Sequence, residues 1–327
     1  MNPEIIVRPG RPDDVPFLQT FTRNTFEWGD YVADALEDWL KEPGDLWVAE
    51  VQGKPVGVNH VRYLSSDEAW FEGIRVHPDY RRMGVGTRLT EAAIKGARER
   101  GAKVARVAID GDNYKSQAMS RSIGFVPVDE LVVFSKDLPA GSANERTPAA
   151  ADSLNVKTRA KGDVEGITMD EEGIAVVDLS PSDVPLLVNE ALRTLKYGGC
   201  DYTWRRLSIG GVLTDLADGV RVMAAKDSSG AIRGGTWYGA YFVEPDHERG
   251  GLMTVMVELG SIFGDEPAIM ALVHWAEIIL AEKRDKDGLP AARLFANCRA
   301  GTQASSILPR LGFSPDDRVL GIWELEL

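Results

Sequence analysis

A short segment of this 327-residue chain combines arginines and glycines in a spacing that suits an anion. It reads HPDYRRMGVGTRL, residues 77–89, and places Arg81 and Arg82 just before Gly84 and Gly86. Glycines carry no side chain, so successive backbone N–H groups can turn toward one ligand. The N-terminus of a following helix adds about half a positive charge. We therefore expect a pyrophosphate-binding loop here.

The spacing excludes two other phosphate-binding loops. A dinucleotide fingerprint requires G-x-G-x-x-G, but the residue three positions after Gly86 is Leu89, and no G-K-[ST] follows for a P-loop. The net charge of −13 argues against a broad surface for nucleic acid or anionic membranes. A small polyanionic ligand fits this local cluster of arginines better.

With its flanks the loop resembles motif A of the GNAT superfamily of N-acetyltransferases, [RQ]-x-x-G-x-[GA]. The segment IRVHPDYRRMGVGTRL is similar to the strand, loop and helix of that family as one block, and Asn113 precedes Gly124-Phe125 at the family's second characteristic spacing. The resemblance covers residues 4–137. It implies a mixed α/β fold and transfer of an acetyl group from acetyl-CoA directly to an amine.

The resemblance also implies where acetyl-CoA binds. Ile74 and Val76 are expected to offer backbone groups to the pantetheine arm, and the Ile74 N–H to polarise the thioester carbonyl. Asn113 is expected at the pantetheine or cysteamine end. The full expected set is Ile74, Arg75, Val76, Arg81, Arg82, Met83, Gly84, Val85, Gly86, Thr87 and Asn113. No metal is expected.

Direct transfer requires a base for the ammonium proton and an acid for the departing thiolate. Glu72, in FEGIRV, is the candidate base, because strand alternation predicts Glu72, Ile74 and Val76 on one face. The same carboxylate could instead only pair with an arginine at the sheet surface. His60, on the neighbouring predicted strand, is the second candidate.

The acid position departs from the family pattern. A tyrosine commonly stands four residues before the Gly-Phe pair, where this chain has Ser120. A serine hydroxyl is a far weaker acid than a phenol, so it could hydrogen-bond the thiolate but would donate a proton poorly. Tyr114, beside Asn113, is the alternative acid. We expect slower turnover, not its loss.

Two short segments bear on the acceptor. The segment FEWGDYV holds Trp28 and Tyr31 among acidic residues, which would suit a small cationic or amino-acid substrate with His60 nearby, although it could equally be a packed interhelical loop. A faint similarity of EG-I-RV to histidine N-acetyltransferases favours a free amino acid or another small amine, polyamines included. Two alternatives remain: a non-catalytic acyl-CoA-binding or regulatory module, and a protein N-terminal or lysine acetyltransferase.

Length and repeats predict two tandem GNAT-like domains. Residues 1–138 alternate predicted strands and helices, including a hairpin around Gly53-Lys54, and residues 139–155 are rich in small and polar residues, as in a linker. PDDVPFL, residues 12–18, recurs as PSDVPLL, residues 181–187, which suggests a duplication. Residues 156–327 are therefore expected to be a second copy.

The second copy is expected to lack a cofactor site. Its counterpart of the loop begins Gly264-Asp265-Glu266-Pro267, with no arginine and two carboxylates where phosphates would bind, and Gly301 stands in place of Asn113. The chain should then be a monomer with an internal pseudo-dimer, or a homodimer. Two cysteines and a start without a signal-peptide pattern indicate a cytoplasmic protein.

Overall fold

The computed structural model describes residues 4–23, 25, 30–138, 156–157, 167–169, 173–200, 203–246 and 251–327. The chain divides into two compact units: Met1–Val128 with Gly321–Leu327, and Asp129–Leu320. The expected linker, 139–155, lies outside the described residues. The expected domains differ from these units because residues 129–138 fall in the second unit and the last seven residues in the first. A strand belongs to the sheet in which its edges pair, whatever its place in the sequence.

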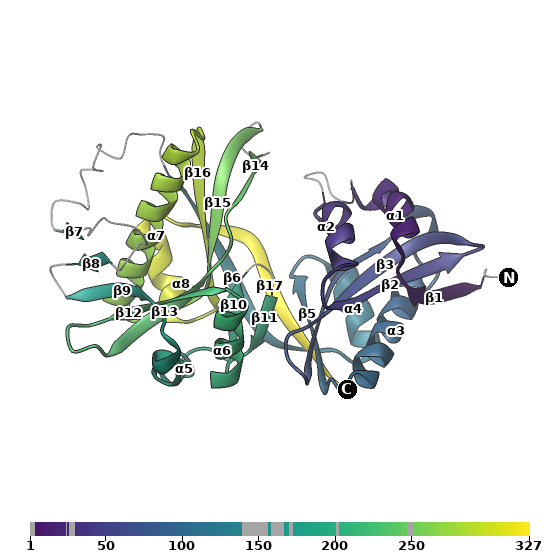
Figure 1. Ribbon diagram of the computed structural model, residues 1–327, viewed down its shortest axis with the longest axis horizontal. Coiled ribbons are helices and arrows are strands. Elements are labelled where there is room, and N and C mark those ends of the chain that lie inside the picture. Colours follow the sequence, from purple (N-terminus) through teal and green to yellow (C-terminus); the bar gives the residue numbers. More distant parts are fainter. Residues whose placement is uncertain are drawn as a thin grey trace. The chain divides into compact units, whose positions relative to one another are not determined.

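The first unit is a mixed sheet with helices on both faces (Figure 1). Its strand order is β1-β2-β3-β4-β5-β17. The strands are β1 (Ile5–Pro9), β2 (Gly44–Val51), β3 (Lys54–Tyr63), β4 (Glu68–Val76), β5 (Val104–Asp110), the start of β6 (Val126–Leu138) and the end of β17 (Ser314–Glu326). The helices are α1 (Val15–Thr22), α2 (Val32–Trp39), α3 (Val85–Glu99) and α4 (Tyr114–Ile123), with 3-10 turns η1 (Pro12–Asp14) and η2 (Pro78–Tyr80).

Two apolar clusters fix the helices of this unit on their faces of the sheet. Leu18 of α1 and Leu36 of α2 pack with Val58 of β3, whereas Val85 and Leu89 of α3 form a separate cluster on other strand residues. The predicted hairpin around Gly53-Lys54 is confirmed as the antiparallel pair β2 and β3. Strand β4 thus has α2 over one face and α3 over the other.

The second unit repeats this order of elements. Its strand order is β6-β16-β15-β13-β12-β9-β8-β7, and β14 pairs with β15. The strands are β7 (Val156–Lys157), β8 (Ile167–Met169), β9 (Ile174–Asp178), β10 (Tyr197–Cys200), β11 (Thr203–Arg206), β12 (Arg221–Lys226), β13 (Ile232–Tyr238), β14 (Phe242–Asp246), β15 (Leu252–Gly264) and β16 (Ala291–Arg299). The helices are α5 (Val184–Ala191), α6 (Ile209–Ala217), α7 (Glu266–Lys286) and α8 (Gln303–Ile307), with 3-10 turns η3 (Pro181–Asp183) and η5 (Leu308–Leu311).

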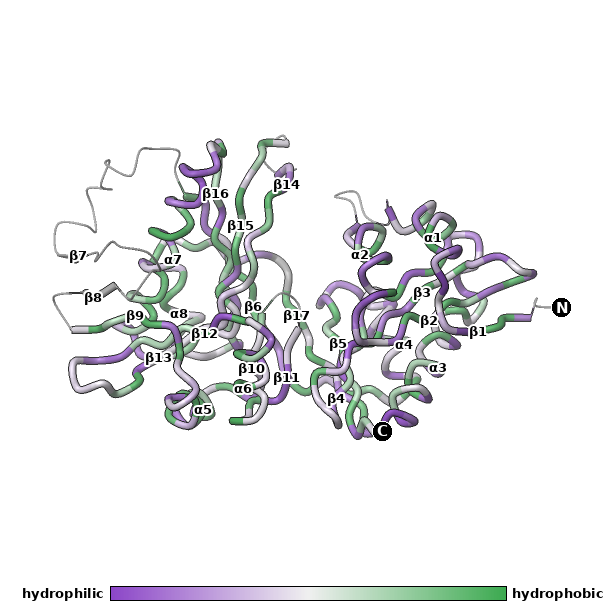
Figure 2. The backbone as a smooth tube through the Cα atoms, viewed as in Figure 1, coloured by the Kyte–Doolittle hydropathy of each residue, from purple (hydrophilic) through white to green (hydrophobic). Residues whose placement is uncertain are grey.

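The main helices of the two units differ in amphipathicity. Helix α3 buries one face, whereas α7 buries residues along most of its length, including Ile269, Leu272, Trp275 and Leu280, and carries many hydrophobic positions in Figure 2. A helix that is apolar on several sides belongs in the interior of its unit. None of the helices described is both long and apolar enough to cross a membrane.

Candidate active site

Strand β4 contains a bulge at Gly73. His60 faces Glu72 across the ladder, but Val58 faces Arg75, so β4 holds one residue more than β3 in this stretch. Gly73 has φ +65°, and a Cβ built on it would lie 2.3 Å from Cη2 of Trp39. Only glycine combines this backbone conformation with such close contact to an indole ring.

The bulge overturns the prediction that Glu72, Ile74 and Val76 share a face. Glu72 contacts His60, whose ring stacks on Trp39 of α2, whereas Ile74 and Val76 pack with the cluster beneath α3. An extra residue reverses the alternation of side chains beyond it. The sequence did not predict Trp39 and Gly73 as site residues. The only sequence signal was the position of Trp39, an aromatic residue at the end of the amphipathic run YVADALEDW.

Beyond the bulge, β4 and β5 no longer pair with each other. Their parallel ladder runs from Glu68 opposite Val104 to Trp70 opposite Arg106, yet β4 continues to Val76 and β5 to Asp110. Backbone groups at these strand ends are therefore left unused by this ladder. Backbone hydrogen-bonding groups of this kind are what an extended amide-bearing arm would need.

The start of α3 and helix α4 converge on the same strand end. A Cβ built on Gly86 would lie 3.1 Å from Sδ of Met119 and 3.8 Å from Cδ1 of Ile74 and from Cγ2 of Val76. The glycine thus allows the first turn of α3 to lie directly against β4 and α4. This brings the start of α3, the end of β4 and helix α4 together.

The N-terminus of α3 has no side-chain cap. Its N-cap residue is Gly84, with φ +87°, and a Cβ built there would meet no atom within 4 Å. The first N–H groups of a helix have no intrahelical partner, and Arg81 and Arg82 beside them are exposed. Arg82 also has a positive φ, +63°, so the loop turns sharply just before the helix. Positive charge and unpaired N–H donors at one place suit an anionic ligand.

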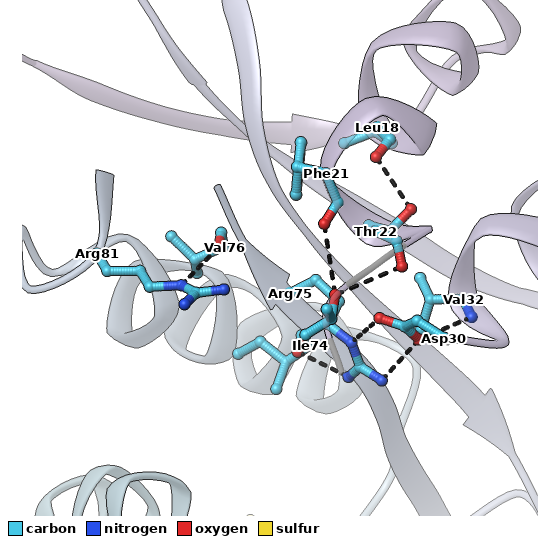
Figure 3. A network of polar contacts seen from close by, with 10 residues as sticks. Leu18, Phe21, Thr22, Asp30, Val32, Ile74, Arg75, Val76 and Arg81 are labelled. Atoms are coloured by element: carbon cyan, nitrogen blue, oxygen red, sulfur yellow. Dashed lines mark hydrogen bonds and ion pairs between the residues drawn. The ribbon is translucent and has the colours of Figure 1, made fainter. Parts of the chain in front are cut away.

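The remaining loop residues differ in how far their side chains are buried. The side chain of Val85 is buried, so only its backbone can serve a ligand; Met83, Gly86 and Thr87 are half-buried. Nε of Arg81 donates to the carbonyl of Val76 at 3.1 Å (Figure 3). This hydrogen bond ties the arginine-rich loop to the end of β4.

Arg75, predicted to contact the cofactor, is engaged elsewhere. Its Nε and Nη2 donate to the buried carboxylate of Asp30 at 2.6 and 2.9 Å, and its Nη1 donates to the carbonyl of Ile74 at 3.0 Å (Figure 3). Its guanidinium also lies 5.7 Å from the ring centroid of Tyr31. None of these partners belongs to the loop of residues 77–84. Trp28, the other predicted acceptor residue, lies outside the described residues.

Glu72 is held by two basic groups. Its Oε1 lies 2.8 Å from Nδ1 of His60 and 3.3 Å from Nη2 of Arg62. The Glu72 side chain is 13% exposed and that of His60 is fully buried. His60 therefore lies behind the carboxylate and out of reach of a substrate. Of the two predicted bases, Glu72 is the one that reaches the surface.

The α4 residues occupy different environments. Asn113 caps the helix, since its Oδ1 accepts from the Ser116 N–H at 3.1 Å, which leaves its amide nitrogen for a ligand. Ser120 is 6% exposed, and its hydroxyl makes no hydrogen bond to another described residue. Tyr114 is 74% exposed in the first turn. Of the two predicted acids, Ser120 is buried and Tyr114 is exposed.

In the second unit the corresponding positions are satisfied internally. Ser261, with φ +48°, forms the counterpart of the bulge, and its N–H donates to Oδ1 of Asn297 at 2.6 Å. A Cβ on the neighbouring Gly260 would lie 2.1 Å from the carbonyl of Gly199 in β10. The side chain of Asp265 caps α7 by accepting from the Ala268 N–H at 3.1 Å. This helix terminus carries its own anion, in contrast to α3.

The described residues include no group of three His, Cys, Asp or Glu side chains arranged to hold a metal ion. The two cysteines, Cys200 and Cys298, are buried free thiols. The polar chemistry of the site thus comes from Glu72 with its partners, the α3 terminus and α4.

Comparison with known proteins gives a family for the first unit and a fold for the whole chain. Residues 15–125 match the model of the Acetyltransferase (GNAT) family. An uncharacterised N-acetyltransferase of Methanocaldococcus jannaschii is 29% identical over 100 residues, which cover 27% of this chain and 42% of that protein. The chain therefore matches less than half the length of this relative.

Two solved structures are similar over nearly the entire chain. A tandem GNAT protein from the clavulanic acid biosynthesis pathway is 15% identical with a TM-score of 0.58, covering 99% of this chain and 98% of its own. A GCN5-related N-acetyltransferase from Sphaerobacter thermophilus is 15% identical with a TM-score of 0.57, covering 98% and 95%. At this identity the likeness concerns the fold alone, and that fold is a tandem of two such domains.

Proposed function

We propose that this chain, whose residues 15–125 match the GNAT family of acetyltransferases, transfers an acetyl group from acetyl-CoA to a primary amine of a small molecule. The observation that carries this proposal is the uncapped N-terminus of α3, with Gly84 open and two exposed arginines beside it. It lies against the end of β4, where the ladder to β5 has ended. A pyrophosphate fits the first feature and an extended pantetheine arm fits the second.

When bound, acetyl-CoA supplies a thioester whose carbonyl carbon an amine can attack. The residues that would hold it are Arg81, Arg82 and the N–H groups of the first turn of α3, with Asn113 offering its amide nitrogen. The backbone of Ile74 and Val76 would align the arm. Arg75 would act indirectly. Its Nη1 donates to the Ile74 carbonyl, and its ion pair with Asp30 fixes the guanidinium in place.

The reaction forms one C–N bond and breaks one C–S bond. Glu72 would take the proton that the attacking nitrogen loses, using Oε2, since the closest contacts of His60 and Arg62 are to Oε1. Ser120 would hydrogen-bond the departing sulfur without donating its proton efficiently, because an aliphatic hydroxyl is a weak acid. Proton return to the thiolate then falls to solvent, which still allows turnover because a thiolate is a good leaving group.

We further propose that only the first unit binds acetyl-CoA, since Asp265 and Asn297 satisfy the corresponding groups in the second. A small acceptor is favoured over a peptide by the FEWGDYV and EG-I-RV segments. Buried free thiols fit a reducing, cytoplasmic location. This chain has Ser120 where the family commonly has a tyrosine. That difference favours a second candidate function, an acyl-CoA-binding module without turnover.

A thiol-release assay tests these proposals. Purified protein with acetyl-CoA should release CoA when amino acids, polyamines or short peptides are supplied one class at a time, and we expect release with a small amine. Glu72→Gln should lower kcat by about 10²–10⁴, the usual contribution of a positioned base, while calorimetry finds acetyl-CoA affinity nearly unchanged. Binding without release for any acceptor would support the non-catalytic module, and release with peptides alone would support a protein acetyltransferase.

A further inference from the structure

His60 lies in a buried slot between α2 and β2. Its side chain is completely buried on β3. The imidazole stacks on the indole of Trp39 with ring centroids 4.5 Å apart and planes 8° apart. On another side lies Gly44 of β2, where a Cβ would be 2.8 Å from Nε2 of His60. Both ring position and ring plane are therefore fixed by neighbours on α2 and β2.

The polar contacts of this ring are one-sided. Nδ1 lies 2.8 Å from Oε1 of Glu72, whereas the buried Nε2 has no hydrogen-bond partner in the part of the chain that the structure describes. An ionised carboxylate can only accept, so Nδ1 must carry the hydrogen. A hydrogen on Nε2 would be a buried donor without a partner, which is costly. The surroundings thus favour the tautomer with its hydrogen on Nδ1.

We propose that His60 is a positioning residue for Glu72, an inference that rests on the proposed role of Glu72 as the base. Its Nδ1–H holds Oε1 in place, and Arg62 meets the same oxygen at 3.3 Å. Oε2 accepts no hydrogen bond from the described residues. His60 thereby orients Oε2 toward the attacking amine.

This geometry also excludes His60 as a proton relay. To pass on a proton received from Glu72, the ring would have to release a hydrogen from Nε2. Nε2 has no hydrogen-bond partner among the described residues, and the ring has no contact with solvent. A proton taken by Glu72 therefore leaves from the carboxylate itself.

Two substitutions separate the hydrogen bond from the packing. His60→Phe keeps a flat ring for Trp39 and removes the donor, whereas His60→Asn keeps an N–H near the Nδ1 position and removes the stack. We expect His60→Phe to lower kcat by roughly 10- to 100-fold, the effect of a misplaced catalytic group, with the KM for acetyl-CoA within about 3-fold. His60→Asn should retain kcat within about 5-fold of the parent.

A double-mutant cycle tests whether His60 acts through Glu72. In the Glu72→Gln background, His60→Phe should slow turnover no further. A full additional loss, or His60→Asn as slow as His60→Phe, would overturn the positioning role and leave a packing role. If Glu72→Gln itself keeps normal turnover, Glu72 is not the base. That result is distinct from a cycle that contradicts the positioning role of His60.

A measurement on the unmodified protein tests the proposal even if the variants do not fold. Imidazole ¹⁵N spectra of the four histidines should show one ring, assigned to His60 by its contact with Trp39, with its hydrogen on Nδ1. A hydrogen on Nε2 in place of Nδ1 would overturn the proposal.

Discussion

Gly73 in β4 and Ser261 in β15 are counterparts, 188 residues apart, and both have a positive φ, +65° and +48°. The same distance separates Phe125 from Phe313, the landmarks of the suspected repeat. A left-handed conformation is costly for serine. Ser261 is compensated by hydrogen bonds from its N–H to Asn297 and from its Oγ to the Gly199 carbonyl. The bulge belongs to the duplicated fold, but what lies against it differs between the units.

Gly73→Ala should therefore disturb both stability and catalysis. A methyl group at position 73 would collide with Trp39, which positions His60. Gly53→Ala is the matched control, since Gly53 has φ +78° but open space around its Cβ position. We expect Gly73→Ala to lower the free energy of unfolding by about 1–3 kcal/mol more than the control, the usual cost of overpacking. If urea titrations give equal losses of unfolding free energy for the two variants, Trp39 moves aside without destabilising the fold.

Acetyl-CoA should bind once per chain, with Gly84→Asp eliminating binding. Aspartate at the N-cap would give α3 the internal anion that Asp265 gives α7. Gly84→Asn has nearly the same shape without the charge, and asparagine tolerates a positive φ. Calorimetry should give a stoichiometry near one for the parent, no binding for Gly84→Asp, and a loss below about 10-fold for Gly84→Asn. A site that survives Gly84→Asp would mean that the second unit binds the ligand.

The loop at residues 81–87 could be predicted from the sequence because its chemistry lies in one contiguous segment. The bulge could not, because EAWFEGIRV reads as an uninterrupted strand and a lone glycine fits many conformations. The Asp30–Arg75 pair joins residues 45 positions apart. It depends on how α2 packs on the sheet, which alternation alone does not specify. That the last seven residues belong to the first unit could not be predicted for the same reason, since a strand's pattern does not say which sheet it joins.

Cys298 should be unreactive in the folded protein. Burial raises the pKa of its thiol to about 12, so at pH 8 roughly one molecule in ten thousand carries the reactive thiolate. Because the folded pKa exceeds the unfolded value, this group stabilises the fold below about pH 9 and the contribution is lost as the pH rises toward 12. In a Cys200→Ala background, iodoacetamide should label Cys298 in urea and leave it unlabelled in buffer. Rapid labelling in buffer would contradict its burial.

Ser120 should make a modest contribution to turnover. Ser120→Ala should raise the activation barrier by less than about 1.5 kcal/mol, the scale of one neutral hydrogen bond. Ser120→Tyr would restore a phenol, but position 120 is buried, so the ring needs room that the site does not have without adjustment. We expect either a several-fold higher kcat or weaker acetyl-CoA binding by steric conflict. If Ser120→Ala abolishes turnover with binding intact, the serine is itself an essential relay.

The last seven residues should be essential for the first unit. Trp323 is buried in the cluster that contains Phe71 and Phe125, and Arg121 lies 4.7 Å from its ring centroid. Glu324 accepts from Nε of the buried Arg106 at 2.8 Å. Truncating such a tryptophan typically costs about 3–5 kcal/mol. Trp323→Ala should therefore unfold the acetyl-CoA site at a lower temperature than the parent.

A fragment of residues 1–138 tests the same dependence more directly. It holds every proposed acetyl-CoA contact but lacks Trp323 and Glu324, so its apolar cluster and Arg106 are left incomplete. We expect it to be unfolded by circular dichroism and unable to bind acetyl-CoA. A fusion of residues 1–128 to residues 314–327 through a flexible linker should recover the fold. If the fragment of residues 1–138 instead folds and binds acetyl-CoA with the affinity of the full chain, the C-terminal strand contributes packing that the first unit does not require.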